Sequence, residues 1–320
     1  MSNAQATSMG VIARVWSWLP ARIDRRVRFI AWASLACQLL LVGTGGLVRL
    51  TGSGLGCPTW PECTAGSIVT TPEMGFHGII EFGNRLLTFV LVIIVILAFF
   101  AVFRMRKVRR DLFWLTLIQA LSIPFQAVLG GISVLAKLNP YVVGSHFIVS
   151  MVLVRITATL VYRVYHGPRG TSAATPPWYA LTTRVAAVFV AITVVLGILT
   201  TGAGPHAGDE NTHRNGFDPK LIETLHAVPA FAVFVLTLAL VVGAIRLGLP
   251  RLFPLLLLAV EVLQITVGLI QANTGLPPFL VGVHLVLAGL LVAAMTAVTH
   301  TLESDADLAK PAPEAATIAA

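Results

Sequence analysis

The sequence has few charged side chains. Only 11% of its 320 residues are Asp, Glu, Lys or Arg, whereas 56% are hydrophobic. A soluble globular domain carries about 25% charged residues, so this composition excludes an ordinary soluble fold. It predicts a polytopic membrane protein, whose helices each need about 20 mostly apolar residues to cross the bilayer.

Basic residues are scarce in every second loop between the apolar stretches. They gather in the N-terminal segment and in three loops, for example "RMRKVRR", whereas the intervening loops carry acidic residues such as Glu62 and Asp209. The positive-inside rule therefore predicts a multi-pass protein of the cell (plasma) membrane with both termini in the cytoplasm. This distribution also accounts for the net charge of +8. Membrane lipid is the expected partner, and nucleic acid is not.

Cysteine is rare as well, with three in the chain. Cys37 lies within an apolar stretch and is expected to be a small packing residue. Cys57 and Cys63, in "GCPTWPEC", lie in the first outward loop, where an oxidising compartment favours a disulfide over a free reactive pair or a metal site. The equivalent loop of the second half has no cysteine, so only the first half can form such a bond.

Eight apolar stretches are long enough to span a membrane. No cleavable signal peptide is expected, because the first stretch is too long and lacks a small-residue cleavage site. Two pairs of stretches are joined by short segments containing "KLNP" and "GLPP", which predict tight hairpins with proline in the first turn of the second helix. The predicted fold is all-α. Its helices are expected at about residues 28–50, 76–103, 111–136, 140–165, 179–201, 220–245, 251–273 and 277–300.

The second half of the chain repeats the first. "TGSG" matches "TGAG", and Glu81-x-x-Asn84 matches Glu223-x-x-His226. Because four spans return the chain to its starting side, we expect two tandem four-helix bundles of the same orientation, related by a pseudo-two-fold axis along the membrane normal. At one constant offset, the second half matches Gln126, Gly130, Gly144 and His146 with Gln264, Gly268, Gly282 and His284.

The repeat divides the chain into segments. The tail "ESDADLAKPAPEAATIAA" is rich in Ala and Pro and is expected to be disordered. The predicted segments are a cytoplasmic N-terminal segment (1–27), the first unit (28–165), a cytoplasmic linker (166–178), the second unit (179–300) and the cytoplasmic tail (301–320).

Four of the eight histidines lie inside predicted helices, near the outward ends. His146 and His284 each follow a proline by six residues, so at 1.5 Å per residue both should lie roughly 9 Å from the helix end. Two histidines that face each other across a four-helix bundle can ligate a haem iron from both sides. The plainer interpretation is a hydrogen bond to a neighbouring helix, but matched depths in duplicated units favour haem. The four are His77, His146, His226 and His284.

Glycines accompany these histidines in the repeat. A glycine lets a flat macrocycle approach the helix backbone closely. We therefore expect the haem to lie against the glycines that the repeat matches, namely Gly130, Gly144, Gly268 and Gly282.

Several motifs resemble those of the haem A synthase family. They are "GGLVRLTGSGLGCPTWPEC", "IIEFGNRLLT", "GSHFIVS", "IETLH" and "GVHLVLA", and the resemblance covers residues 28–300. Members of that family are membrane enzymes that oxidise the C8 methyl of haem O to the formyl group of haem A for terminal oxidases. The resemblance implies a haem b (iron protoporphyrin IX) cofactor in the second unit and haem O as substrate in the first. Haem O synthase, as the haem donor, and an electron acceptor are the implied partners.

The resemblance also assigns roles to residues of the first unit. His146 would face the iron of the substrate haem, and Glu81 would be the catalytic carboxylate at the reacting edge. A carboxylate there can stabilise positive charge on the methyl carbon or accept a proton from attacking water. Arg85 and Arg49 are candidates for binding haem propionates, although Arg85 can instead pair with Glu81, and Arg49 can snorkel at its helix end.

In the second unit, the resemblance makes His226 and His284 the axial ligands of the haem b iron. Asn84 is also a predicted contact of the substrate haem, although the first unit departs from the family pattern at this position, where many members have histidine. Asn is a poor iron ligand, and His77 lies about 10 Å away along the same helical stripe. Either His77 joins His146 on the substrate iron from a shifted position, which we favour, or His146 binds this iron alone.

Two other classes of protein compete with haem A synthesis. A transmembrane di-haem electron-transfer cytochrome would use the same histidine pairs without modifying haem. Such proteins place their haems near opposite membrane faces, whereas all four histidines here lie toward one side. Duplicated bundles also occur in transporters, but Pro124 and Pro229 are the only comparable interruptions, and bundle kinks explain both. The di-haem cytochrome is therefore the alternative that remains.

Overall fold

In the computed structural model, which describes residues 19–172 and 175–305, the chain forms eight long helices. They are α2 (Arg25–Leu50), α3 (Gly75–Phe103), α4 (Arg110–Leu135), α5 (Pro140–His166), α6 (Pro177–Ala203), α7 (Pro219–Leu247), α8 (Leu252–Asn273) and α9 (Pro278–His300). Local sequence signals set several of the starts. Asp24 caps α2 by accepting hydrogen bonds from the backbone N–H groups of Arg26 and Val27, and prolines open α5, α6, α7 and α9.

All eight helices are long and apolar enough to cross a membrane. The shortest has 22 residues and the longest have 29. At 1.5 Å per residue they extend about 33–44 Å, which exceeds the roughly 30 Å hydrocarbon core of a bilayer. The prediction of an all-α polytopic membrane protein is confirmed. The predicted helix ends agree within three residues, and the largest difference is that α2 begins at Arg25 instead of residue 28.

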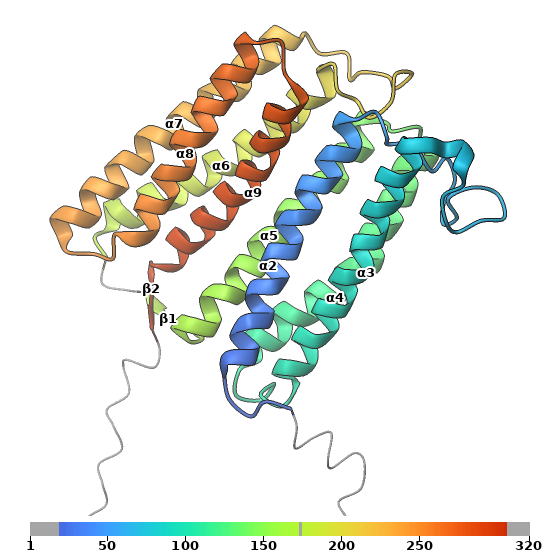
Figure 1. Ribbon diagram of the computed structural model, residues 1–320. Helices are drawn as coiled ribbons and strands as arrows, with labels where there is room; N and C mark the ends of the chain where they lie inside the picture. Colours follow the sequence, from blue (N-terminus) through green and yellow to red (C-terminus); the bar gives the residue numbers. More distant parts are fainter. Residues whose placement is uncertain (1–18, 173–174, 306–320) are drawn as a thin grey trace, which may run out of the picture.

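The helices pack in two closed rings (Figure 1). In the first ring, α2 and α4 each contact both α3 and α5. In the second ring, α6 and α8 each contact both α7 and α9. Each half therefore has the same order of neighbours, as two tandem four-helix units predict, and the symmetry axis itself stays a prediction. One consequence matters for the site: α3 and α5 stand at opposite corners of the first ring, and α7 and α9 at opposite corners of the second.

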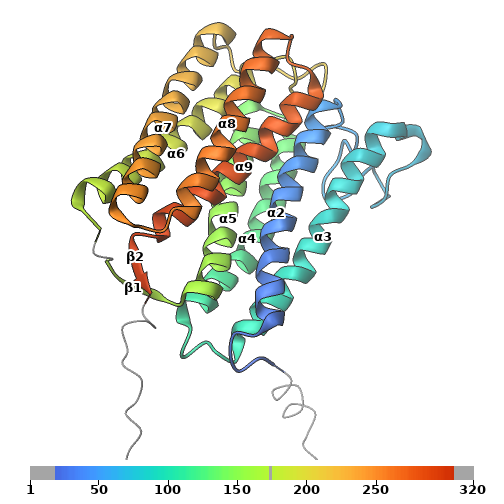
Figure 2. The ribbon, with the colours of Figure 1, turned by 60° about the vertical axis from the view of Figure 1, so that its left-hand side comes forward.

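The two rings meet along α2, α5, α6 and α9. Figure 2 shows α9 beside α2 and α5. Glycines allow this close packing: a Cβ added at Gly289 would lie 2.7 Å from Leu39 Cδ2, and one added at Gly144 would lie 2.7 Å from Ile198 Cγ2. Small residues at helix crossings are the usual device for close packing in membranes. The expectation that Gly144 and Gly282 face a macrocycle is therefore wrong, because they face Ile198 and Leu50 of the opposite ring.

The two ends of the molecule differ in character. We call the end that carries the loops 51–74 and 204–218 the cysteine-loop end, and the opposite end, where the first and last described residues lie, the terminal end (Figure 1). Buried apolar side chains fill both rings toward the terminal end, with Leu112 and Leu160 in the first ring and Leu240 and Leu257 in the second. The helix halves that carry the four histidines lie toward the cysteine-loop end.

Hydrogen bonds join the two rings at the cysteine-loop end. The backbone N–H of Gly54, after α2, donates to the carbonyl of Gly208 at 2.8 Å. Arg49 donates to the carbonyls of His206 and Thr201, the latter at 2.6 Å, and thereby caps the last turn of α6 with a positive charge. Loops that are distant in the sequence are thus held as one layer.

At the terminal end, the chain forms a small sheet that the sequence did not predict. β1 (Arg169–Ser172) pairs antiparallel with β2 (Glu303–Asp305), and the Glu303 carboxylate pairs with Arg163 of α5. The predicted disordered tail (301–320) is therefore wrong for residues 303–305, because the strand pairing and the Glu303 ion pair hold them. Residues 306–320 of that tail, and residues 1–18 of the predicted N-terminal segment, lie outside the described residues.

The contact between α2 and α9 predicts a position-specific effect of glycine substitution. A Cβ added at Gly46 would lie 2.8 Å from Leu285 Cδ1, whereas one added at the adjacent Gly45 would meet nothing within 4 Å. Gly46→Ile should therefore destabilise the protein by about 1–3 kcal/mol through overpacking, and Gly45→Ile should not. Thermal unfolding of both variants in the same detergent measures the difference. Equal unfolding midpoints would show that the rings do not meet at this glycine.

Candidate functional site

The second ring brings two histidines face to face. His226 of α7 and His284 of α9 approach from opposite corners, with their ring centres 6.3 Å apart and their planes at 69°. A metal ion bound by one nitrogen of each imidazole, about 2 Å from either, would hold the ring centres about 6 Å apart. The spacing of this pair therefore fits an iron held between two axial histidines.

The surroundings of His226 fix its protonation. Its Nδ1 lies 3.0 Å from the backbone carbonyl oxygen of Thr193 on α6, so Nδ1 carries the proton and donates. The lone pair of Nε2 is then free to bind a metal, which is the usual arrangement for a histidine ligand. His284 differs, because its Nδ1 is buried and has no hydrogen-bond partner. A buried polar atom without a partner is costly, and a bound group is one way to satisfy it.

Each imidazole lies against a glycine of a neighbouring helix. A Cβ added at Gly197 would lie 2.9 Å from His226 Cε1, and one added at Gly268 would lie 3.2 Å from His284 Cε1. The contact between Gly268 and His284 has a counterpart in the first ring. There, a Cβ added at Gly130 would lie 3.5 Å from His146 Cε1. Gly268 therefore makes room for the His284 ring itself, where the sequence predicted room for a macrocycle, whereas a Cβ at Gly130 would make only an ordinary van der Waals contact with His146.

The first ring does not pair its histidines in the same way. His146 of α5 is partly buried, and its Nδ1 has no hydrogen-bond partner. His77, in the first turn of α3, is exposed, and its Nδ1 lies 2.9 Å from the Ser53 hydroxyl. Within residues 19–172 and 175–305, a ring contact between two histidines occurs only for His226 and His284. Joint binding by His77 and His146 thus stays a prediction.

A disulfide loop closes the cysteine-loop end of the first ring. Cys57 and Cys63 are both fully buried and form the predicted disulfide. The Trp60 ring between them packs against Gly131 of α4. The described residues contain no cluster of three or more His, Cys, Asp or Glu side chains that could hold a metal ion. Because the disulfide uses the sulfurs of both cysteines, the rival prediction of a cysteine metal site is wrong.

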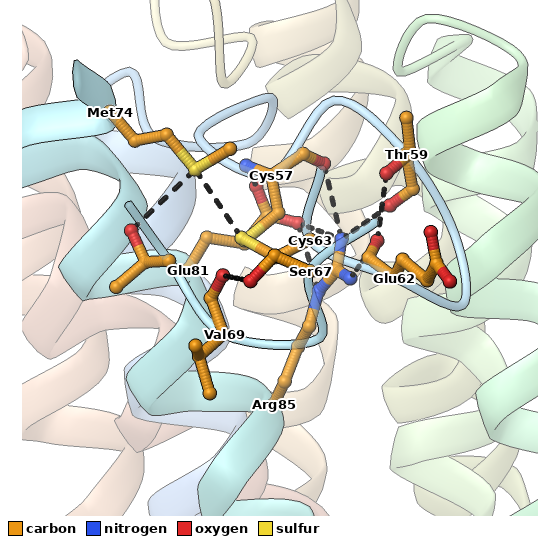
Figure 3. Close-up of a disulfide and its surroundings, with 10 residues drawn as sticks. Cys57, Thr59, Glu62, Cys63, Ser67, Val69, Met74, Glu81 and Arg85 are labelled. Carbon is orange, nitrogen blue, oxygen red and sulfur yellow. Dashed lines mark hydrogen bonds and ion pairs between the residues drawn. A yellow bond between two sulfur atoms is a disulfide. The ribbon is translucent and has the colours of Figure 1, made fainter. Parts of the chain in front are cut away.

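Arg85 of α3 anchors this loop (Figure 3). Its Nη2 donates to the backbone carbonyls of Cys57 and Thr59, each at 3.2 Å, and its Nη1 donates to that of Glu62 at 3.3 Å. Figure 3 shows the Arg85 side chain rising from α3 into the turn formed by these carbonyls. One guanidinium group thus donates to three loop carbonyls, of which that of Glu62 also accepts a hydrogen bond from the Thr59 hydroxyl at 3.0 Å.

Glu81 lies between Arg85 and the disulfide. It is only 5% exposed; its Oε1 accepts from Arg85 Nη2 at 2.6 Å, and its Oε2 accepts from the backbone N–H of Cys57 at 2.7 Å. The carboxylate is therefore held in a fixed orientation and its charge is compensated. Glu223, at the matching position in the second half, differs: its side chain is 40% exposed and lies 3.5 Å from Lys220. Only the first unit therefore has a buried carboxylate at this position.

The remaining predicted residues have structural partners. Asn84 accepts a hydrogen bond at 2.8 Å from Thr44 Oγ1 of α2, so it links α3 to α2. Arg49 donates hydrogen bonds from its Nε and Nη2 to carbonyls of the second unit, as described above. Cys37 is buried in an apolar cluster with Leu91 and Val95. The packing role predicted for Cys37 is confirmed.

Comparison with protein families identifies the chain. The model of the COX15-CtaA family, described as cytochrome oxidase assembly protein, matches residues 28–296. The chain belongs to this family. The match covers both rings, so the resemblance that the motifs indicated is confirmed.

The alignments with individual relatives are shorter than the match to the family model. A heme A synthase of Geobacillus thermodenitrificans is 28% identical over 136 residues, and one of Geobacillus kaustophilus is 30% identical over 137 residues; both alignments cover 42% of each chain. A heme A synthase of Listeria welshimeri is 32% identical over 120 residues, or 37% of this chain and 39% of the relative. The chain thus matches about two-fifths of the length of these curated relatives.

Sequence reasoning missed one buried pair in the second ring. Glu261 of α8 is 3% exposed and accepts a hydrogen bond at 2.7 Å from Thr237 Oγ1 of α7, while its Oε2 has no partner. The signal was available, since a carboxylate in the middle of an apolar span is costly and marks the bundle interior. The repeat concealed it, because Glu261 has no acidic counterpart in the first half.

The anchoring role of Arg85 predicts the effect of removing its charge. In Arg85→Gln, the disulfide loop should open more often, and backbone amide hydrogen exchange at residues 57–63 should rise at least roughly tenfold, because each hydrogen bond to a charged group contributes about 1.5–3 kcal/mol. The matched control is Lys220→Gln, which removes an exposed cation at the same end of the molecule. Unchanged exchange in the loop of Arg85→Gln would contradict the anchoring role.

Proposed function

We propose that this family member is a haem A synthase, which oxidises the C8 methyl of haem O to the formyl group of haem A with water as the oxygen source. The observation that supports this most directly is the facing pair of His226 and His284, inside a chain whose relatives bear the name heme A synthase. The second ring offers two histidines that would hold a redox-active haem, and the first ring offers a buried carboxylate that would lie near the substrate.

The stoichiometry of the reaction defines what the protein must handle. Conversion of a methyl group and one water to a formyl group releases four electrons and four protons. The substrate iron needs a ligand, the water needs a base, and the electrons need an acceptor outside the chain. The implied partners are therefore haem O, the haem O synthase that supplies it, and an electron acceptor.

The second ring supplies the residues for a haem b cofactor. His226 and His284 would hold its iron, with the Thr193 carbonyl orienting His226. Such a haem, when bound, supplies one-electron transfer. The donor set fits because both imidazoles come from opposite corners of the ring and are set at a spacing that suits a shared iron.

The first ring supplies the substrate site. His146 would bind the iron of haem O, and we favour His77 as a second, shifted contributor. The Ser53 hydroxyl occupies Nδ1 of His77 and leaves Nε2 for another partner. The Asn84 side chain accepts a hydrogen bond from the Thr44 hydroxyl, which agrees with a substrate site in which Asn84 does not bind the iron.

Glu81 would act at the reacting carbon. An ionised carboxylate offers about four lone-pair positions, and Arg85 and the Cys57 N–H donate to both of its oxygens without exhausting them. The carboxylate can therefore accept a proton from water while its own position stays fixed. A fixed negative charge also stabilises positive charge that develops on the methyl carbon. Arg85 and Arg49 remain proposed contacts for haem propionates.

We further propose that the protein lies in the plasma membrane with its termini in the cytoplasm. The terminal end carries the basic loop around Lys107 and Arg110, together with Arg25, Arg28 and Arg251. This placement satisfies the positive-inside rule. It puts the disulfide and both proposed haem sites toward the outer face.

Pigment extraction tests the proposed reaction. Membranes that make haem O should accumulate haem A when the chain is expressed, and Glu81→Ala should keep the extracted haem O while losing haem A. Mass analysis of the extracted haems measures both. Protein that carries haem but yields no formylated product would instead be an electron-transfer cytochrome.

Replacement of single histidines tests the cofactor site. His226→Ala and His284→Ala should each abolish the low-spin spectrum of a haem with two histidine ligands, because one axial ligand is lost. His213→Ala, an exposed histidine in the loop 204–218, is the control and should leave that spectrum unchanged. An unaltered spectrum in either ligand variant would rule out this pair.

A further inference from the structure

A pocket of about 520 Å³ opens at the terminal end, between the first two turns of α2 and the last turn of α5. It lies at the opposite end of the molecule from the histidine sites and does not depend on the proposed reaction. Its volume falls within the roughly 300–1,000 Å³ of sites that bind small molecules. The residues that matter for its chemistry are Asp24, Arg25, Arg28, Phe29, Trp32 and Tyr165.

The α2 wall of this pocket is ordered from charged to aromatic. Arg25, Arg28, Phe29 and Trp32 occupy positions i, i+3, i+4 and i+7 of the helix, so they share one helix face. All four are exposed, Phe29 by 71% and Trp32 by 51%. From Arg25 to Trp32 the helix rises about 10 Å, which spans the change from the headgroup layer to the acyl chains. The face therefore has the same polarity gradient as a phospholipid.

The opposite wall holds Arg28 in place. Its guanidinium carbon lies 5.1 Å from the centre of the Tyr165 ring, and Trp32 Nε1 donates to the Tyr165 hydroxyl at 3.1 Å. Stacking on an aromatic face leaves the N–H edge of a guanidinium free to donate. The cation is thus oriented in advance, with its donors available to an anion.

The carboxylate in the pocket does not cancel these charges. Asp24 Oδ1 accepts hydrogen bonds from the backbone N–H groups of Arg26 and Val27 at 2.9 and 3.1 Å, so it is committed to capping α2. The positive end of the α2 dipole compensates its charge. Arg25 and Arg28 therefore give the pocket a net positive character.

We propose that this pocket binds an anionic phospholipid, whose phosphate is held by Arg25 and Arg28 and whose acyl chains lie on Phe29 and Trp32. A free phosphate ion would use the arginines and leave the exposed aromatic residues without a role. A zwitterionic phospholipid would use the aromatic residues but bring its own cation close to the arginines. Only a lipid with net negative charge uses the whole pocket.

Lipid binding to the full chain in detergent tests the proposal by native mass spectrometry. The probes are phosphatidylglycerol and phosphatidylcholine with identical acyl chains, so they differ in headgroup charge alone. We expect preferential binding of phosphatidylglycerol, weakened roughly 30-fold in Arg25→Gln/Arg28→Gln, which is about fivefold per arginine. The matched control is Lys107→Gln/Arg110→Gln, which removes two exposed cations at the same end outside the pocket and should change binding less than about threefold.

Two further measurements separate the pocket from a diffuse charge effect. Trp32→Ala keeps the charge and should still weaken phosphatidylglycerol binding, and phosphatidylglycerol should raise the unfolding temperature of the wild type but not of Arg25→Gln/Arg28→Gln. Equal losses in the two double variants would overturn the proposal in favour of general surface charge. Equal binding of both lipids, or displacement of phosphatidylglycerol by inorganic phosphate, would overturn it as well.

Discussion

A helix that crosses a membrane satisfies its own backbone hydrogen bonds, but its polar side chains must find partners inside the bundle. This constraint explains most polar contacts in the two rings. Asn84 pairs with Thr44, Glu261 with Thr237, and the buried Ser34 hydroxyl donates to Gln119 at 2.6 Å. The groups that break the rule stand out for that reason. Among these groups are the Nδ1 atoms of His146 and His284, which are buried without a hydrogen-bond partner at matching positions of the repeat.

The two rings share a plan and differ in their contents. The first ring carries the disulfide loop and the compensated carboxylate of Glu81, whereas the second carries the facing histidines and the pair of Thr237 and Glu261. By the offsets that align Glu81 with Glu223 and Gln126 with Gln264, the first-ring counterparts of Thr237 and Glu261 are Val95 and Ile123. Both belong to an apolar cluster. The two halves thus share a packing frame and differ in their polar interiors, which agrees with the proposed division between a substrate site and a cofactor site.

The sequence predicted the helices because their signal is local. Apolar length, prolines at helix starts and loop charge determine where a span begins and which way it runs, and these need no knowledge of neighbours. The depth of His226 and His284 was predictable for the same reason, since depth is a count of residues along one helix. The disulfide was predictable because its two cysteines are separated by only six positions.

Contacts between helices were harder to predict, because periodicity specifies a face and not the neighbour that the face meets. Gly144 and Gly282 match in the repeat, yet they pack on the opposite ring, and Arg49 reaches carbonyls more than 150 positions away. The sequence predicted that Glu81 and Arg85 lie on adjacent turns of one helix. It did not predict that Arg85 would also donate hydrogen bonds to carbonyls of the disulfide loop. Glu261 could not be predicted from the repeat, because the matching position in the first half is Ile123.

The reach of Arg49 has a consequence for how the duplicated halves behave. Its donor belongs to α2, and its acceptors are Thr201 in the last turn of α6 and His206 beyond it. If either half were produced alone, the carbonyls at the end of α6 would lose the Arg49 guanidinium that donates to them. The Arg49 side chain of α2 would likewise lose its hydrogen-bond acceptors. In this chain the two halves are therefore interlocked, and neither has its full set of hydrogen bonds without the other.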